Sequence, residues 1–185
     1  MEDSTTEQPS LLQHAIRWGL IMAGVSIALT ILIYVIDYTI MVQLKFLGLS
    51  LLIYLGLTIY AGINYRNAIG GFLPYGKAFQ HGFLVLALSA LVGTIFGFIL
   101  YNLIDTELPQ KLVDASVENA RAMMEKFGAP EDSIEPALEK ARVDAADRFT
   151  PLGQIKGYLV ALIFCAIMSL ISSIFVKKNQ PVEMM

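Results

Sequence analysis

The stretch YRNAIGGFLPYGKAFQHG, at residues 65–82, separates two long apolar segments, and the rest of the chain is arranged around it. Basic residues mixed with glycine and proline are typical of a short connection at a membrane face, where a chain leaves the bilayer, turns and re-enters. The stretch therefore predicts a membrane-face loop at 65–77. Its candidate functional residues are charged, have a titratable ring or are conformationally permissive glycines. They are Arg66, Gly70, Gly71, Lys77 and His81.

The composition of the 185-residue chain is that of a membrane protein. Hydrophobic residues make up 56% and charged residues only 16%, and the mean hydropathy is +0.61. Four windows, at 18–36, 46–65, 83–104 and 157–176, are nearly free of ionisable groups. Each has about the 20 apolar residues that a helix needs to cross a bilayer. They lack the polar face, repeating about every 3.6 residues, that a helix of a soluble protein would show. The predicted fold class is an all-α membrane protein with four transmembrane helices and an extramembrane helical hairpin between helices 3 and 4.

The expected segments follow each other without a domain boundary. The acidic start of the chain predicts that the first apolar helix is retained rather than cleaved as a signal peptide. The order is a polar tail at 1–10, transmembrane helices at 11–36 and 44–64, a basic loop at 65–77, a helix at 78–104, an amphipathic hairpin at 105–151, a helix at 152–176 and a basic tail at 177–185.

Small residues recur at four-residue spacing in the third and fourth apolar segments. This spacing places them on one helix face, where they let another backbone approach closely. We expect these two faces to pack together, although small residues are common in membrane helices for other reasons. The single cysteine excludes an intramolecular disulfide. The predicted packing residues are Ser89, Gly93 and Gly97 in one segment and Ala161, Cys165, Ser169 and Ser173 in the other.

The segment 105–151 is the only sizeable part outside the apolar windows, and it has eleven acidic against six basic residues. Gly128-Ala129-Pro130 interrupts it with a helix stop and a turn. The flanking halves each show apolar residues at helical spacing, which predicts an antiparallel hairpin. Alternatively, one arm lies flat on the membrane surface. The apolar positions are Val113, Val117, Ala120, Met124 and Phe127 before the turn, and Ile134, Leu138, Ala141, Ala145 and Phe149 after it.

No motif in the chain predicts catalysis, a metal or a cofactor. Gly71 to Lys77 fits the pattern GxxxxGK, but a phosphate-binding loop needs a hydroxyl residue next, where this chain has Ala78, and a preceding strand. The two histidines, His14 and His81, are too few for a histidine-rich metal site. We expect His81 to form an interfacial or interhelical hydrogen bond, because it lies one turn into an apolar segment.

The distribution of basic residues predicts the orientation in the membrane. Arg66 and Lys77 in the short second connection, and Lys177 and Lys178 after the last apolar segment, favour the cytoplasmic side. Both termini would then be cytoplasmic and the hairpin periplasmic. The six Lys and Arg residues of the hairpin favour a cytoplasmic hairpin instead, because that segment is short enough for the positive-inside rule to include it.

The central stretch also resembles a known family. Tyr65-Arg66, Gly70-Gly71-Phe72, Tyr75 to Phe79 and Gly82 are similar to the YR…GG…F-GKAF…G signature of an uncharacterised family of bacterial four-helix membrane proteins. This family is catalogued as a domain of unknown function and is frequent in the Bacteroidota. The resemblance covers nearly the whole chain. It implies an integral inner-membrane protein, and it supplies no activity and no catalytic residues.

These observations favour a non-enzymatic membrane protein that serves assembly, as an accessory or scaffold subunit or as a homo-oligomer. Its expected partners are the lipid bilayer and a membrane protein or a second copy, and no nucleic acid. One alternative is a small transporter or channel subunit, with Asn64, Arg66, Lys77 and His81 lining an entrance. A second is a binder of lipid headgroups, because basic residues at a membrane surface attract anionic lipids.

Overall fold

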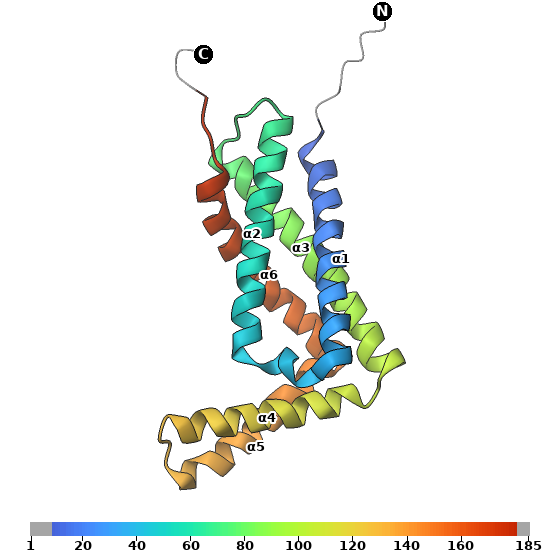
Figure 1. Cartoon of the computed structure of the whole chain (residues 1–185), viewed down its shortest axis with the longest axis vertical. Helices are drawn as coiled ribbons and strands as arrows, with labels where there is room; N and C mark the ends of the chain where they lie inside the picture. The colour runs from blue at the N-terminus through green and yellow to red at the C-terminus, as the bar shows by residue number, and fades with distance from the viewer. Residues whose placement is uncertain (1–8, 181–185) are drawn as a thin grey trace, which may run out of the picture. The chain divides into compact units, whose positions relative to one another are not determined.

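A computed structural model describes residues 9–180, and apart from one isolated β-bridge the regular structure of these residues is helical (Figure 1). Most of the expected polar tail at 1–10 and the second half of the tail at 177–185 lie outside the described residues. The elements are α1 (Leu11–Asp37), the 3₁₀-helix η1 (Tyr38–Val42), α2 (Leu44–Ala68), α3 (Tyr75–Ile99), the π-helical turn η2 (Leu100–Ile104), α4 (Leu108–Lys126), α5 (Glu131–Phe149) and α6 (Pro151–Val176).

Within the described residues, four helical segments are long and apolar enough to cross a membrane, which confirms the predicted fold class. They are Leu11–Val42, Leu44–Ala68, Tyr75–Ile104 and Pro151–Val176, with mean hydropathies between 2.0 and 2.7. Only 17% to 28% of the residues in their most apolar windows are buried within the chain. The apolar side chains that remain exposed are suited to contact lipid. The two shorter helices α4 and α5 lie between the third and fourth of these segments.

The connection in the central stretch is shorter than expected. Helix α2 continues to Ala68 and α3 begins at Tyr75, so only 69–74 lie between them. Gly70 and Gly71 have φ angles of 98° and 87°, a conformation that side chains with a Cβ disfavour. Pro74 then accepts the first amide hydrogen bonds of α3 through its carbonyl oxygen. Arg66 and Lys77 therefore belong to helix ends and not to the loop.

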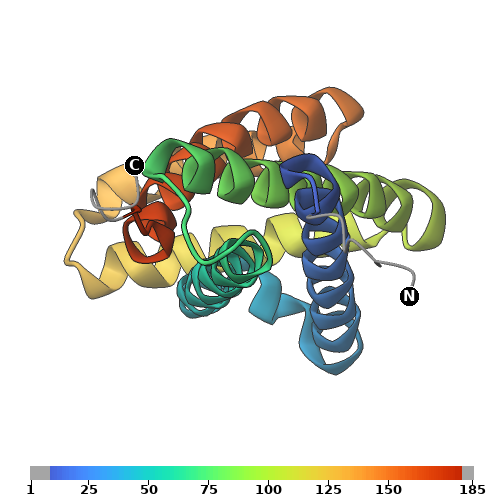
Figure 2. The same cartoon turned by 90° about the horizontal axis from the view of Figure 1, so that it is seen from above.

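The chain forms two compact units, which are described separately. Of the described residues, the first contains 9–24, 52–90 and 161–180. In it, the beginning of α3 lies beside the end of α6 (Figure 2). The Ser169 hydroxyl donates to the Phe79 carbonyl oxygen at 2.7 Å, and the Tyr75 hydroxyl donates to the Leu170 carbonyl oxygen at 3.1 Å. The main core of this unit contains Ala15, Met22, Val85, Leu86 and Cys165.

Helices α3 and α6 approach each other closely at Gly82, where a Cβ atom would lie 2.8 Å from Ser169 Oγ. Of the predicted packing residues, Ser89, Cys165, Ser169 and Ser173 are buried. Gly93 has nothing within 4 Å of a Cβ position, and Gly97 would meet mainly the ring of Tyr101 in its own helical segment. Three of the four residues predicted on α6 are thus buried, and the glycine that α6 approaches closely is Gly82.

The second unit contains Val25–Leu51 and Leu91–Val160. At its centre Leu100, Leu108 and Leu112 are buried among partly buried side chains that include Tyr34, Tyr38 and Phe149. Asp105 orients the start of α4: its carboxylate accepts hydrogen bonds from the backbone amides of Glu107 and Leu108 and from the Tyr34 hydroxyl. The Tyr34 hydrogen bond is the largest cause of the lowered pKa of Asp105. Asp105 therefore joins the hairpin to α1 within this unit.

Helices α4 and α5 form the predicted antiparallel hairpin (Figure 1). Val113, Ile134, Leu138 and Ala145 are buried, and Gly128 makes the turn with a φ of 72°. Phe127 differs from the expectation, because its side chain is 78% exposed. Helix α4 ends at Lys126, so Phe127 already belongs to the turn and lies beyond the packed helix face.

An ion pair across the hairpin predicts a dependence of stability on pH. Arg142 donates to Asp114 Oδ1 at 2.7 Å, and this hydrogen bond is the main cause of the lowered pKa of Asp114. A carboxyl group whose pKa is lower in the folded than in the unfolded chain stabilises the fold at pH values above its unfolded-state pKa of about 3.9. This stabilisation is lost as the pH falls through its folded-state pKa. We expect the thermal midpoint of the wild type to exceed that of Asp114→Asn near neutral pH. This difference should shrink below about pH 4. Asp144→Asn, which removes a carboxylate elsewhere on α5, is the control for the loss of a negative charge from the hairpin.

Candidate functional site: a buried histidine cluster

Polar side chains from three helices meet in the first unit. His14 lies in the first turn of α1, Asn64 and Tyr65 in the last turns of α2, and His81 in the second turn of α3. All four positions are near helix ends within candidate membrane spans. We call His14, Asn64, Tyr65 and His81 the histidine cluster.

The two imidazole rings are hydrogen-bonded to each other. His14 Nδ1 lies 2.9 Å from His81 Nε2, and His14 Nε2 lies 2.9 Å from Asn64 Oδ1. His81 is 0% exposed and His14 is 8% exposed, whereas Asn64 is exposed. The cluster thus forms a short polar chain that runs from the surface of the unit at Asn64 to a fully buried imidazole at His81.

Aromatic rings surround the pair. The Tyr65 ring is parallel to the His81 ring, at 2° and a centroid distance of 4.9 Å, and it lies 5.0 Å from the His14 ring. Trp18, one turn after His14, has its ring centroid 6.3 Å from that of His14. The rings of Tyr65 and Trp18 therefore form apolar walls around the polar chain, and Tyr65 covers one face of His81.

Two buried nitrogen atoms beside these contacts have no hydrogen-bond partner in the described structure: Nδ1 of His81 and Nε of Arg66. Arg66 uses another nitrogen, Nη1, to donate to the Val176 carbonyl oxygen at 2.8 Å. That carbonyl is at the C-terminus of α6, where helix carbonyls lack intrahelical partners. Arg66 therefore caps α6, whereas His81 Nδ1 is left without a hydrogen-bond partner in the described structure.

The charged side chains in the described part of this unit are all of one sign. Among residues 9–24, 52–90 and 161–180 there is no Asp or Glu. The positively charged residues in those ranges are Arg17, Arg66, Lys77, Lys177 and Lys178. The described part of the unit is thus electropositive around the histidine cluster.

The central loop is held by the segment after α6. Leu73 and Lys178 exchange two backbone hydrogen bonds of 2.8 and 2.9 Å as an antiparallel bridge. The ammonium groups of Lys177 and Lys178 lie over the rings of Tyr75 and Phe72, at 5.9 and 5.5 Å. Gly70 and Gly71 allow the turn that brings Leu73 to this position.

The five predicted loop residues have different positions and contacts in the structure. His81 enters the histidine cluster, and its expected interhelical hydrogen bond is present. Arg66 caps α6, the two glycines shape the loop, and Lys77 is exposed. The structure does not bring these five together as one site.

Sequence reasoning missed His14 as the partner of His81. A signal was available, because these are the only two histidines, and each lies near the start of an odd-numbered apolar segment. Odd-numbered membrane spans enter the bilayer from the same side, so the two side chains were predictable at the same depth. Within the described residues, no group of three or more His, Cys, Asp or Glu residues could hold a metal ion.

Comparison with known proteins identifies one family. A family model described as "Protein of unknown function (DUF4199)" matches residues 17–178. The matched range includes Asn64, Tyr65 and His81 of the histidine cluster. No curated protein and no solved structure matches the chain.

Proposed function

The chain belongs to the DUF4199 family of proteins of unknown function, and from this premise we propose that it is a non-enzymatic accessory or scaffold subunit of a membrane complex. The proposal places it in the inner membrane of a bacterium, as the similarity of its YR…GG…F-GKAF…G stretch to a family frequent in the Bacteroidota suggests. Both termini would be cytoplasmic and the hairpin periplasmic, which the basic residues Arg66, Lys77, Lys177 and Lys178 favour.

The observation that carries the proposal is the exposed apolar tip of the hairpin. Met123 and Phe127, one turn apart near the end of α4, are 50% and 78% exposed. Val113 and Leu138 are buried residues of the hairpin, and Met123 and Phe127 lie outside this buried part. Aromatic and methionine side chains are enriched in protein interfaces relative to other surfaces. The tip is therefore suited to contact another protein.

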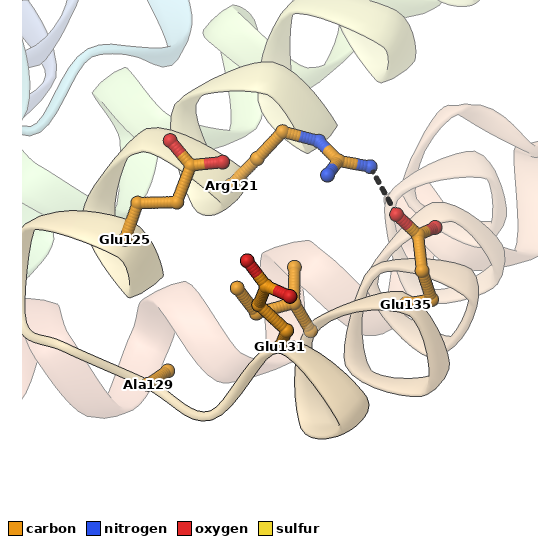
Figure 3. Close-up of a pocket in the computed structure, with 6 residues that line it drawn as sticks. Arg121, Glu125, Ala129, Glu131 and Glu135 are labelled. Atoms are coloured by element: carbon orange, nitrogen blue, oxygen red, sulfur yellow. Dashed lines mark hydrogen bonds and ion pairs between the residues drawn. The ribbon is translucent and has the colours of Figure 1, made fainter.

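The charges at the tip indicate the chemistry of that protein. A cleft beside the turn is lined by three carboxylates and one guanidinium, and Figure 3 shows Arg121 joined to Glu135 by a hydrogen bond of 2.7 Å, with Glu125 and Glu131 nearby. The net negative charge favours a basic segment of a partner. Interfaces commonly combine aromatic side chains with a polar rim.

Purification from the native membrane in a mild detergent, with mass determination and identification of co-purifying chains, tests the proposal. We expect a stoichiometric partner. Phe127→Ser should lose it, while Val143→Ser should keep it, because Val143 is a similarly exposed residue (61%) on the other arm of the hairpin. A wild type that purifies as a lone monomer would contradict the proposal, as would equal retention of the partner by both variants.

Gly93 provides a test of assembly through the membrane helices. A Cβ atom there would meet nothing within 4 Å inside the chain, so Gly93→Leu is expected to fold. If the small-residue face of α3 contacts another membrane helix, the added side chain prevents close approach. We then expect a smaller particle by light scattering in detergent. An unchanged particle size would mean that this face of α3 does not take part in assembly, and only the hairpin would remain as the contact.

A small transporter or channel subunit is a second candidate function, and the histidine cluster favours it. Titratable groups within membrane spans commonly mark ion or proton pathways, and His14 and His81 are two such groups in contact. The purified protein alone should then produce a flux in liposomes, and substitution of His14 or His81 should change it. Liposomes without flux would exclude this function.

A further inference from the structure

We propose that His14 and His81 form a binding site for a single proton, which is taken up at Nδ1 of His81. The inference is independent of the accessory function proposed above. It rests on the hydrogen-bond directions in the histidine cluster, on the unpartnered nitrogen and on the rings around it.

The hydrogen bond from His14 to the Asn64 side chain determines which nitrogen carries the hydrogen atom in each imidazole ring. The carbonyl oxygen Oδ1 of Asn64 can only accept a hydrogen bond, so His14 Nε2 is the donor. In a neutral imidazole the other nitrogen is then an acceptor, so His14 Nδ1 accepts from Nε2–H of His81. His81 Nδ1 therefore carries a lone pair. It is buried and has no partner in the described structure.

This lone pair is the one place where the neutral pair can accept a proton without losing a hydrogen bond. Protonation of His14 Nδ1 would put two N–H donors face to face across the 2.9 Å contact. A proton on His81 Nδ1 leaves both hydrogen bonds in place. The intact pair therefore accepts one proton and excludes a second.

The surroundings act on the charged form in two opposite ways. The parallel ring of Tyr65, at 4.9 Å, presents its π-face to His81 and attracts an imidazolium. The charged groups carried by the packed elements oppose it: Arg17 on α1, Arg66 on α2, Lys77 on α3, and Lys177 and Lys178 after α6. The hydrogen-bond directions are those of a neutral pair, and we expect it to take up its proton on acidification.

Two glutamine variants separate the roles of the rings. In His81→Gln the amide nitrogen can still donate to His14 Nδ1, but the proton acceptor is removed. In His14→Gln the amide oxygen can still accept from His81 Nε2, and the acceptor at His81 Nδ1 remains. Both variants keep a hydrogen bond at the contact between α1 and α3, so each is expected to fold.

The experiment is a pH titration by nitrogen-15 NMR of a histidine-labelled chain in nanodiscs, purified without a polyhistidine tag so that its two histidines are the only ones. At neutral pH each ring should show one unprotonated nitrogen. On acidification we expect one of them, His81 Nδ1, to become protonated with a one-proton slope. His14→Gln should retain this transition, and His81→Gln should lose it.

The fluorescence of Trp18 provides an independent readout, because it is the only tryptophan and lies 6.3 Å from the His14 ring. A positive charge on the coupled pair is expected to quench it over the same pH range. Independent titration of the two rings would overturn the proposal. So would loss of the transition in His14→Gln, its retention in His81→Gln, or the absence of a transition before the protein unfolds.

Discussion

Replacement of Gly153 by alanine is expected to disrupt the corner between α5 and α6. A Cβ atom at Gly153 would overlap the carbonyl group of Asp147. That carbonyl cannot move away, because it accepts hydrogen bonds from the Thr150 amide and hydroxyl, and the hydroxyl accepts one from the Gly153 amide. We expect a loss of at least about 3 kcal/mol of folding free energy, the upper end of the usual cost of overpacking.

Gly157→Ala is the matched control for this substitution. Gly157 lies one turn later in α6, and a Cβ atom there meets nothing within 4 Å. Alanine is the better helix former by up to about 1 kcal/mol, so this variant should be as stable as the wild type or slightly more stable. Unfolding by titration with a denaturing detergent compares the stabilities of the two variants. The rate of tryptic cleavage after Arg148 reports directly whether the corner between α5 and α6 is intact. Equal stability of the two variants would show that the corner is not closely packed.

Truncation of Leu108 to alanine is expected to loosen the base of the hairpin. Leu108 is 0% exposed and packs with Leu100 and Leu112 in the core of the second unit. Removal of a buried leucine side chain costs about 2–5 kcal/mol, because the transfer energy is lost and a cavity remains. The free energy of unfolding should fall by this amount, and hydrogen exchange of the α4 amides should accelerate.

Leu103→Ala controls for the loss of an apolar side chain in general. Leu103 is a near neighbour in sequence, but its side chain is 71% exposed within the chain. It therefore faces lipid or solvent, and its truncation should change the stability by no more than about 0.5 kcal/mol. A similar loss in both variants would mean that Leu108 is not a packing centre.

The sequence by itself determined the number and approximate extent of the membrane helices. The four apolar windows lie within α1, α2, the α3–η2 segment and α6, because the bilayer imposes a length and a composition that can be counted along the chain. It also predicted the hairpin, since Gly128 interrupts two amphipathic patterns, and most of the hairpin core, since helical periodicity selects one face. Family membership likewise follows from the sequence.

The tertiary structure alone decided which polar residues meet. His14 and His81 are 67 positions apart, and no local pattern encodes their contact, which depends on how α1 and α3 are rotated about their axes. For the same reason the sequence favoured Gly93 and Gly97 as contact points, while the close approach occurs at Gly82. A uniformly apolar helix has no periodic polar face to define its rotation. Its orientation is set by side-chain packing between helices, and so the histidine cluster becomes visible only in three dimensions.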